Sequence, residues 1–311
     1  MRFQTLLDIP YGTANGRLLS LDILQPERDP RAALPVVLWL HGGGWSSGNK
    51  RNALNIHMLD FLARSGFVLA SAEYRLSGEA PFPAQIHDVK AALRWLRARP
   101  EVLGIDPERV AIAGFSAGGH LAALAATTVG VPELEGESGS PGYSTRVQAA
   151  IAMAAPTDFT QNPAASDPTL NPNSVGGVTP EQRLLGGRIE ERPELARLAN
   201  PGEFIGPETP PILLIHGSAD EIVPVSQADY LYHVLEGRGI EVAFIRVEGG
   251  NHGCWPAGRP YPSKTLPSRI ESWMLAFLEK RLQGKPGFDL HGVHRIDAEE
   301  IDQPPVNEPE A

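Results

Sequence analysis

Short apolar runs alternate along the chain with longer amphipathic segments. The runs that predict strands cover residues 18–24, 35–40, 67–72, 109–113, 148–154, 211–216 and 241–247. Residues 35–40 (PVVLWL) are apolar throughout, which is typical of a strand covered on both faces. Residues 18–24 alternate polar and apolar positions, as expected of a strand with one exposed face.

The amphipathic segments that predict helices cover residues 53–65, 84–98, 117–127, 226–236 and 267–282. Strands that alternate with helices predict a mostly parallel sheet with helices on both faces. Right-handed crossovers then bring the loops that follow the strands to one edge of the sheet, where ligands bind. We therefore expect an α/β protein whose functional residues follow its strands.

Three stretches depart from this alternation. Residues 130–145 are rich in turn formers and are expected to form a surface excursion. Residues 157–210 contain many prolines and only short helices, near 180–185 and 193–199, and a long irregular segment of this kind is usually a lid or a binding wall. The alternative is a surface insertion without a role. Residues 1–283 are expected to form one domain, followed by a tail at 284–311 that is mobile or packed on the surface.

The composition excludes several classes of protein. Of 311 residues, 42% are hydrophobic and 21% are charged, so the chain is not expected to be disordered. A net charge of −10 argues against nucleic acid as a partner. No apolar run is long enough for a membrane span and no signal peptide is evident, so we expect no membrane partner and a cytoplasmic location, or a secreted one if a leader has been removed. The sequence leaves open whether two copies of the chain form a homodimer.

The strongest chemical signal is the pentapeptide GFSAG at residues 114–118. It is a G-x-S-x-G motif between a predicted strand and an alanine-rich predicted helix, the context that a nucleophilic serine in a tight turn requires. The glycines on either side of Ser116 allow the strand and the helix to approach without Cβ clashes. Ser116 is therefore the candidate nucleophile.

The second signal is HGGGW at residues 41–45, directly after an apolar strand. A glycine run in this place can turn several backbone N–H groups into one cavity, as an oxyanion hole requires. The rival interpretation is a phosphate-binding loop, but the run lacks the GK[ST] ending and the G-x-G-x-x-G spacing. We expect His41 to brace this loop, and Glu73 to support it through Arg75 or Tyr74.

A nucleophilic serine needs a base, and the base needs a carboxylate to orient it. Asp220 follows the predicted strand at 211–216, and His252 follows the one at 241–247. The chain order Ser116, Asp220, His252 is the order expected when separate strand ends supply the three members. Glu221, the residue after Asp220, is the alternative acid that could orient the base.

Other polar residues are expected to have structural roles. His120 should pack or cap within its helix, and Cys254 should be a small packing residue. His87 and Asp88 should be solvated on a surface helix. One cysteine excludes an internal disulfide and a multi-cysteine metal site, and His291 with a nearby histidine at 294 is weak evidence for a metal. We expect no metal and no organic cofactor.

Three segments together carry a family resemblance: residues 41–45 (HGGGW), 74–97 (YRLSGEAPFPAQIHDVKAALRWLR) and 114–124 (GFSAGGHLAAL). From about residue 5 to residue 282 the chain resembles the α/β-hydrolase superfamily. Within it, the chain is similar to the HGGG-containing esterases akin to hormone-sensitive lipase, and most similar to the bifunctional acetylxylan/feruloyl esterase-like group. The resemblance implies an α/β-hydrolase fold, with a mostly parallel eight-stranded sheet flanked by helices and an inserted lid or cap segment at 157–210.

The resemblance also implies roles for residues. Ser116 would be the nucleophile, His252 the base and Asp220 its partner. The backbone oxyanion donors would be Gly43, Gly44 and Ala117. Trp45 would flank the acyl pocket or wall the loop.

The leading hypothesis is a serine carboxylesterase that hydrolyses short-chain, aryl or carbohydrate-linked esters of the acetyl or feruloyl type. Its partner would be a small-molecule or carbohydrate ester. One alternative keeps the machinery and cleaves an amide or formamide, as kynurenine formamidases do. Another is a non-catalytic binding protein on the same fold.

Overall fold

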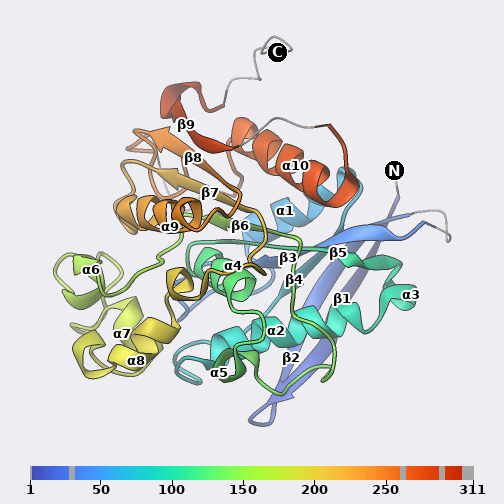
Figure 1. Cartoon of the computed structure of the whole chain (residues 1–311), viewed down its shortest axis with the longest axis horizontal. Helices are drawn as coiled ribbons and strands as arrows, with labels where there is room; N and C mark the ends of the chain where they lie inside the picture. Colours follow the sequence, from blue (N-terminus) through green and yellow to red (C-terminus); the bar gives the residue numbers. More distant parts are fainter. Residues whose placement is uncertain (1, 28–31, 260–263, 287–290, 303–311) are drawn as a thin grey trace.

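A nine-stranded mixed sheet runs through the centre of the computed structural model, which describes residues 2–27, 32–259, 264–286 and 291–302 (Figure 1). The strands lie in the order β1-β2-β4-β3-β5-β6-β7-β8-β9. Their bounds are β1 Phe3–Ala14, β2 Arg17–Pro26, β3 Leu34–Leu40, β4 Val68–Ala72, β5 Ile105–Phe115, β6 Ala149–Met153, β7 Ile212–Gly217, β8 Val242–Glu248 and β9 Gly292–Asp297. β1 pairs with β2 and β2 with β4 in antiparallel fashion, and every other pair is parallel.

The sheet has nine strands where eight were expected, because the predicted tail supplies β9. β9 pairs with β8 in parallel, from Ala243 opposite Gly292 to Glu248 opposite Asp297. Only two of its six residues are large and apolar, and one of them, Val293, is 42% exposed. This short, half-exposed edge strand lacks the apolar run that marks the others. Residues 287–290 and 303–311 of the predicted tail lie outside the described residues.

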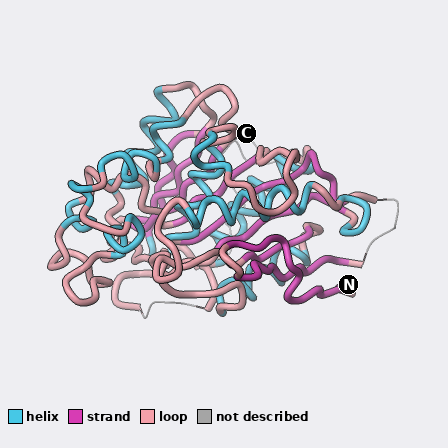
Figure 2. The backbone as a smooth tube through the Cα atoms, turned by 90° about the horizontal axis from the view of Figure 1, so that it is seen from below, coloured by secondary structure: helices cyan, strands magenta, loops and turns pink. Residues whose placement is uncertain are grey.

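Helices cover both faces of the sheet, as predicted. α1 (Ala53–Arg64) and α10 (Ser268–Gln283) pack in one hydrophobic cluster. α2 (Ala84–Arg97), α4 (Ala117–Thr127) and α9 (Ser226–Gly237) pack in the other, on the opposite face. The shorter helices are α3 Pro100–Leu103, α5 Pro132–Glu135, α6 Pro163–Ser166, α7 Pro180–Leu185, α8 Pro193–Leu198, and the 3₁₀ turns η1 Ile189–Glu191, η2 Pro201–Phe204 and η3 Ala298–Glu300. Figure 2 shows most strands running through the middle, with helices and loops around them.

Helix α4 begins directly after Ser116 and is buried along its whole length. Its side chains are mainly alanine and glycine, so the helix can lie close to β5 and β6 on one side and to η2 on another. Close packing of a small-residue helix fixes its first turn relative to the strand ends, which positions the serine before it.

The prediction for Asp88 was wrong, because its side chain is fully buried. Arg75 compensates the charge: its Nη2 donates to Asp88 Oδ1 at 2.7 Å, and its Nε donates to Asp88 Oδ2 at 2.8 Å. A buried carboxylate with a bidentate guanidinium partner is a stable arrangement. Asp88 therefore anchors α2 to the chain that follows β4.

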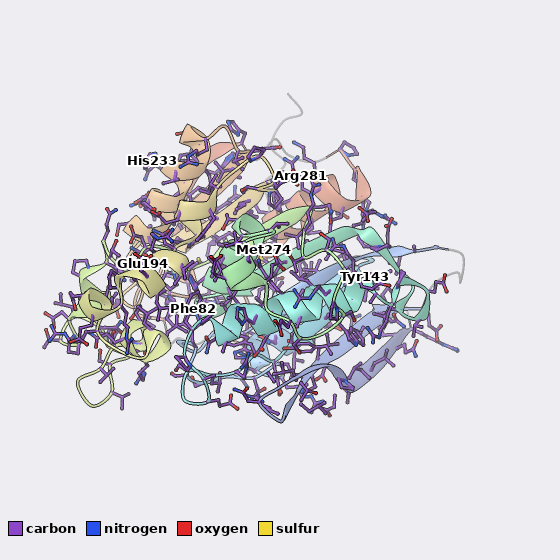
Figure 3. The ribbon with its side chains drawn as sticks, turned by 60° about the horizontal axis from the view of Figure 1, so that its bottom comes forward. Phe82, Tyr143, Glu194, His233, Met274 and Arg281 are labelled. Carbon is purple, nitrogen blue, oxygen red and sulfur yellow. The ribbon has the colours of Figure 1, made fainter. Side chains whose placement is uncertain are left out.

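The cap segment, residues 157–210, lies between β6 and β7 in the sequence and carries α6, α7 and α8. It forms the green and yellow lobe at the lower left of Figure 1. Glu194 of α8 lies on this lobe in Figure 3 and is exposed. The helix α7 begins with a complete capping box, in which the Thr179 side chain accepts from the Gln182 amide and the Gln182 side chain accepts from the Thr179 amide.

The register of the parallel strands aligns their carboxyl ends. Leu40 at the end of β3 lies opposite Gly114 of β5, and Phe115 lies opposite Met153 at the end of β6. Gly217 at the end of β7 lies opposite residue 247 of β8. The loops that carry the candidate chemistry therefore leave the same edge of the sheet.

Candidate active site

Ser116 lies in a strained turn between β5 and α4. Its φ and ψ angles are 55° and −121°, a conformation that non-glycine residues rarely adopt. A Cβ added at Gly114 would lie 2.3 Å from the Gly118 oxygen, and one at Gly118 would lie 2.2 Å from the Leu40 oxygen. The two glycines of the motif are therefore required sterically, since strand, turn and helix cross at backbone contact. The Ser116 amide donates to the Met153 oxygen at 2.8 Å, which fixes the turn against β6.

The structure brings Ser116, Asp220 and His252 together. His252 Nδ1 lies 2.6 Å from Asp220 Oδ2, and His252 Nε2 lies 3.0 Å from Ser116 Oγ. Because a carboxylate only accepts, Nδ1 carries the imidazole proton and Nε2 accepts from the serine hydroxyl. All three side chains are largely withdrawn from solvent, with Ser116 8% and His252 3% exposed.

Glycine also permits the loops of Asp220 and His252 to meet. A Cβ added at Gly217 would lie 2.2 Å from the Gly250 oxygen. The Ala219 amide donates to that same oxygen at 2.9 Å. Backbone contact between the two loops, rather than side-chain packing, therefore sets the distance from the carboxylate to the imidazole.

A second histidine, His216, approaches the same carboxylate and was missed by the sequence analysis. Its Nε2 lies 2.9 Å from the Val223 oxygen and 3.2 Å from Asp220 Oδ2, and the side chain is buried. The amides of Ile222 and Val223 donate to Asp220 Oδ1 at 2.8 and 2.9 Å. Burial alone would raise the pKa of the Asp220 carboxyl, but the charge of His252 and the hydrogen bonds hold it well below its ordinary value. The sequence signal for His216 was its place at the end of β7, four residues before Asp220.

Glu221, the alternative acid, is exposed. It lines a second hollow that also includes Arg259 and shares Asn173, Ile222 and His252 with the cavity at Ser116. The hydrogen bond from His252 goes to Asp220.

The glycine loop after β3 lines the same cavity as Ser116, His252 and Ala117. Gly43 and Gly44 have φ angles of +120° and +56°, and a Cβ at Gly43 would lie 2.3 Å from the Ser47 oxygen. The Gly43 oxygen accepts from the Ser47 amide at 3.1 Å, so the loop closes as a tight turn. The sequence candidates Gly43, Gly44 and Ala117 thus share one cavity wall with the serine.

His41 and Tyr74 brace this loop from beneath. Their rings stack with centroids 4.2 Å apart, and the Tyr74 hydroxyl donates to the His41 oxygen at 2.8 Å. Burial lowers the pKa of His41 to about 4, although its hydrogen bond to the Gly42 oxygen opposes this, so His41 is neutral and structural. Glu73 was expected to support the loop through Arg75 or Tyr74, but its carboxylate accepts from Lys50 at 3.0 Å instead. Tyr74 therefore braces the loop directly, through its own hydroxyl.

Trp45 is 1% exposed and separates the cavity from the core. Its ring forms T-shaped contacts with the rings of His120 and Phe159, at centroid distances of 5.2 and 5.6 Å. His120 is fully buried and its Nε2 lies 2.7 Å from the Ala199 oxygen, so it packs between α4 and the cap segment as expected. Trp45 lines the cavity, and its role beside an acyl group stays a prediction.

The cavity in front of Ser116 holds about 310 Å³. Its floor is the sheet edge that carries Ser116 and His252, and the loops after β6 and β7 add Pro156, Ile222 and Val223. Residues of the cap segment complete the wall: Asn171, Asn173, Val175, Pro180, Glu181 and Arg183. None of these was singled out from the sequence, because the segment lacks periodicity.

Within the described ranges, no group of three or more histidine, cysteine, aspartate or glutamate side chains could hold a metal ion. Cys254 is fully buried, and burial raises the pKa of its thiol far above the ordinary value, so it is inert packing. Among the described helices, none has both the length and the apolar character to cross a bilayer.

Comparisons with known proteins show which sequences and structures this chain resembles. Over 230 residues the chain is 36% identical to the probable carboxylic ester hydrolase LipM of Mycobacterium tuberculosis, which covers 71% of this chain and 49% of LipM. The chain therefore spans about half the length of that relative. Among solved structures, a truncated carbohydrate esterase from gut microbiota superposes with a TM-score of 0.75 at 29% identity, over 90% of this chain and 96% of that one. Propionate-bound Est2 of Thermogutta terrifontis superposes with a TM-score of 0.65 at 28% identity, over 81% and 86% of the two chains.

The family model BD-FAE matches residues 21–235. The match runs from β2 into α9 and includes the serine turn, the glycine loop and the cap segment. Together with the nine-stranded α/β architecture, it confirms the resemblance to the bifunctional acetylxylan/feruloyl esterase group that the sequence motifs indicated. The chain belongs to the BD-FAE family of α/β-hydrolase esterases.

Proposed function

We propose that the protein is a serine carboxylesterase that cleaves its substrate through an acyl-enzyme on Ser116. One observation carries the proposal: the continuous relay from Asp220 through His252 to Ser116, with atom separations of 2.6 and 3.0 Å, opens into a cavity walled by a glycine loop. A nucleophile in reach of an oriented base, beside backbone N–H groups, is the arrangement that acyl transfer requires.

In the proposed mechanism, His252 Nε2 takes the hydroxyl proton while Ser116 Oγ attacks the ester carbonyl carbon. The tetrahedral oxyanion is stabilised by the amides of Gly43, Gly44 and Ala117. His252 then gives the proton to the leaving alcohol oxygen, the C–O bond breaks and an acyl-serine remains. Water, deprotonated by the same nitrogen, attacks the acyl carbon and releases the acid, which restores the serine hydroxyl. Asp220 stabilises the imidazolium in both halves of the cycle.

The size and chemistry of the cavity support a short acyl group and a polar substrate. Its volume of about 310 Å³ lies at the small end of ligand pockets, and Trp45 closes its inner wall. Asn171 and Asn173 line the cap side. Similarity to an esterase bound to propionate, and to a carbohydrate esterase, supports esters of the acetyl or feruloyl type on a small-molecule or carbohydrate alcohol.

Hydrolysis of p-nitrophenyl acetate tests the proposal. We expect Ser116→Ala to lower kcat by about 10⁴-fold or more, because the acyl-enzyme cannot form. Ser272→Ala, at an exposed serine of α10, is the matched control and should keep wild-type activity. Wild-type activity in Ser116→Ala would overturn the proposal.

A substrate panel tests the bond that is cleaved. We expect higher kcat/KM for short p-nitrophenyl esters, acetylated xylan or methyl ferulate than for N-formylkynurenine. A clear preference for the formamide would replace the ester assignment with the amide alternative, while leaving the serine chemistry in place.

A further inference from the structure

A buried carboxyl on the cavity wall has no part in the proposed chemistry. Glu181 is 4% exposed and lines the cavity together with Ser116 and His252. The residue before it, Pro180, lies against the oxyanion loop, since a Cβ added at Gly44 would be 3.3 Å from Pro180 Cβ. Glu181 therefore sits in the part of the cap segment that faces the reacting groups.

The hydrogen bonds of Glu181 leave acceptor capacity unused. Asn171 Nδ2 donates to Glu181 Oε2 over a long 3.4 Å, and Glu181's own amide and the Thr179 side chain add further interactions. Within the described part of the chain the carboxyl forms no ion pair, and Arg183 of the same helix donates to the Asn173 oxygen instead. An ionised carboxyl has about four lone-pair sites, and burying one without a cation is costly.

Helix α7 does not need this acid at its start. Thr179 and Gln182 already form both hydrogen bonds of the capping box. A purely structural role as a cap therefore does not account for a carboxyl in this position.

Few charges face Glu181 inside the cavity. Arg183 comes from its own helix, and His252 comes from the catalytic edge; the lining residues of the oxyanion loop, of the loops after β6 and β7 and of segment 171–175 carry no other titratable group. Burial raises the pKa of the Glu181 carboxyl to about 7, against weaker lowering by its hydrogen bonds and by Arg183. Near neutral pH the group is present in both protonation states.

We propose that Glu181 is a specificity-determining residue that accepts a hydrogen bond from a hydroxyl group of the ester substrate, so that the cavity prefers hydroxylated esters to alkyl esters of the same length. The inference rests on the proposed esterase function. A substrate hydroxyl supplies the donor that the carboxyl lacks, whereas an alkyl group leaves a buried polar group unpaired. The hydroxyl belongs to either the acyl or the alcohol part of the ester, and the assay separates these two sources.

Two matched pairs of esters test this by titration of the released acid. Ethyl 3-hydroxybutyrate against ethyl butyrate places the hydroxyl on the acyl part, and glyceryl monoacetate against propyl acetate places it on the alcohol. In at least one pair, the wild-type protein should favour the hydroxylated ester by about tenfold or more in kcat/KM. Glu181→Leu should abolish or reverse that preference, and Glu181→Gln should keep part of it.

The pH dependence gives a readout that a structural role would not produce. An ionised carboxylate is the stronger acceptor, so the wild-type preference should increase between about pH 6 and about pH 8, on either side of the Glu181 pKa of about 7. The preference of Glu181→Gln, which cannot ionise, should stay flat. Glu194→Gln removes an exposed carboxyl from the same segment and should behave as wild type.

Three outcomes would overturn the inference: no preference in either pair, an unchanged preference in Glu181→Leu, or a pH-dependent preference in Glu181→Gln. Should Glu181→Leu fail to fold, Glu181→Gln alone decides through its pH profile. Ser116→Ala separates this inference from the function beneath it. If Ser116→Ala still hydrolyses the four esters, the proposed function fails. If Ser116→Ala is inactive but the preference for hydroxylated esters is the same with and without the Glu181 carboxyl, only the inference fails.

Discussion

The sheet edge around Ser116 and the cap segment meet in one cavity but are built by different means. At the sheet edge, the three candidate residues follow β5, β7 and β8, and backbone contacts at Gly114, Gly118 and Gly217 fix their separation. The cap segment reaches the same cavity through short helices and turns, and it presents side chains such as Asn171 and Glu181. The comparison teaches that backbone contacts fix the positions of the candidate residues on the sheet side, whereas side chains determine the shape and polarity of the cavity wall on the cap side.

The largest effect in this comparison should come from the sheet edge. Asp220→Asn should lower kcat by about 10⁴-fold, because the amide cannot hold the imidazole with its proton on Nδ1. Glu221→Gln, at the exposed neighbour, is the control and should retain activity. Esterase kinetics within tenfold of wild type for Asp220→Asn, or an equal loss for Glu221→Gln, would mean that the wrong carboxylate has been assigned.

A smaller effect should follow from crowding the glycine loop. Gly43→Ala should lower kcat by about 10²–10³-fold, because its Cβ would lie 2.3 Å from the Ser47 oxygen at a φ of +120° and would displace an oxyanion donor. Gly16→Ala is a matched control, since it combines a φ of +78° with open space in the turn between β1 and β2. If both variants lose activity equally, backbone strain explains the loss and the loop has no special role.

The smallest effect should appear in the stability of the cap segment. The pKa of Glu181 is raised by folding, so its protonated form stabilises the folded state at low pH and this contribution is lost as the pH rises through about 7. Glu181→Gln mimics the protonated form. Its Tm should match wild type near about pH 5 and exceed it by roughly 2 °C or more near about pH 8. A Tm below wild type at both pH values would show that the carboxylate is needed for folding.

The parts of the site that the sequence predicted are those with strict local requirements. The turn at Ser116 demands glycines two residues away on each side, and the order Ser116, Asp220, His252 follows from three strand ends at one edge. Such requirements leave a pattern in the sequence. Seven of the nine strands coincide with segments that the sequence predicted, whereas β1 and β9 were assigned no segment. β9 is short and half-exposed, so its sequence gives little signal.

The parts that the sequence did not reveal depend on distant partners. Asp88 looks solvated until Arg75 is seen beside it, and His216 looks incidental until its distance to Asp220 is known. Glu181 follows a proline in an irregular segment, so nothing in its local pattern indicates burial. Tertiary contacts, rather than periodicity, give these residues their surroundings.

The most direct test of the account is mass spectrometry of the protein after reaction with a fluorophosphonate, which traps a serine that a neighbouring base activates. The account predicts one phosphonyl adduct per chain, on the peptide that contains Ser116, and no adduct in Ser116→Ala. An adduct on another residue, or equal labelling of Ser116→Ala, would contradict it.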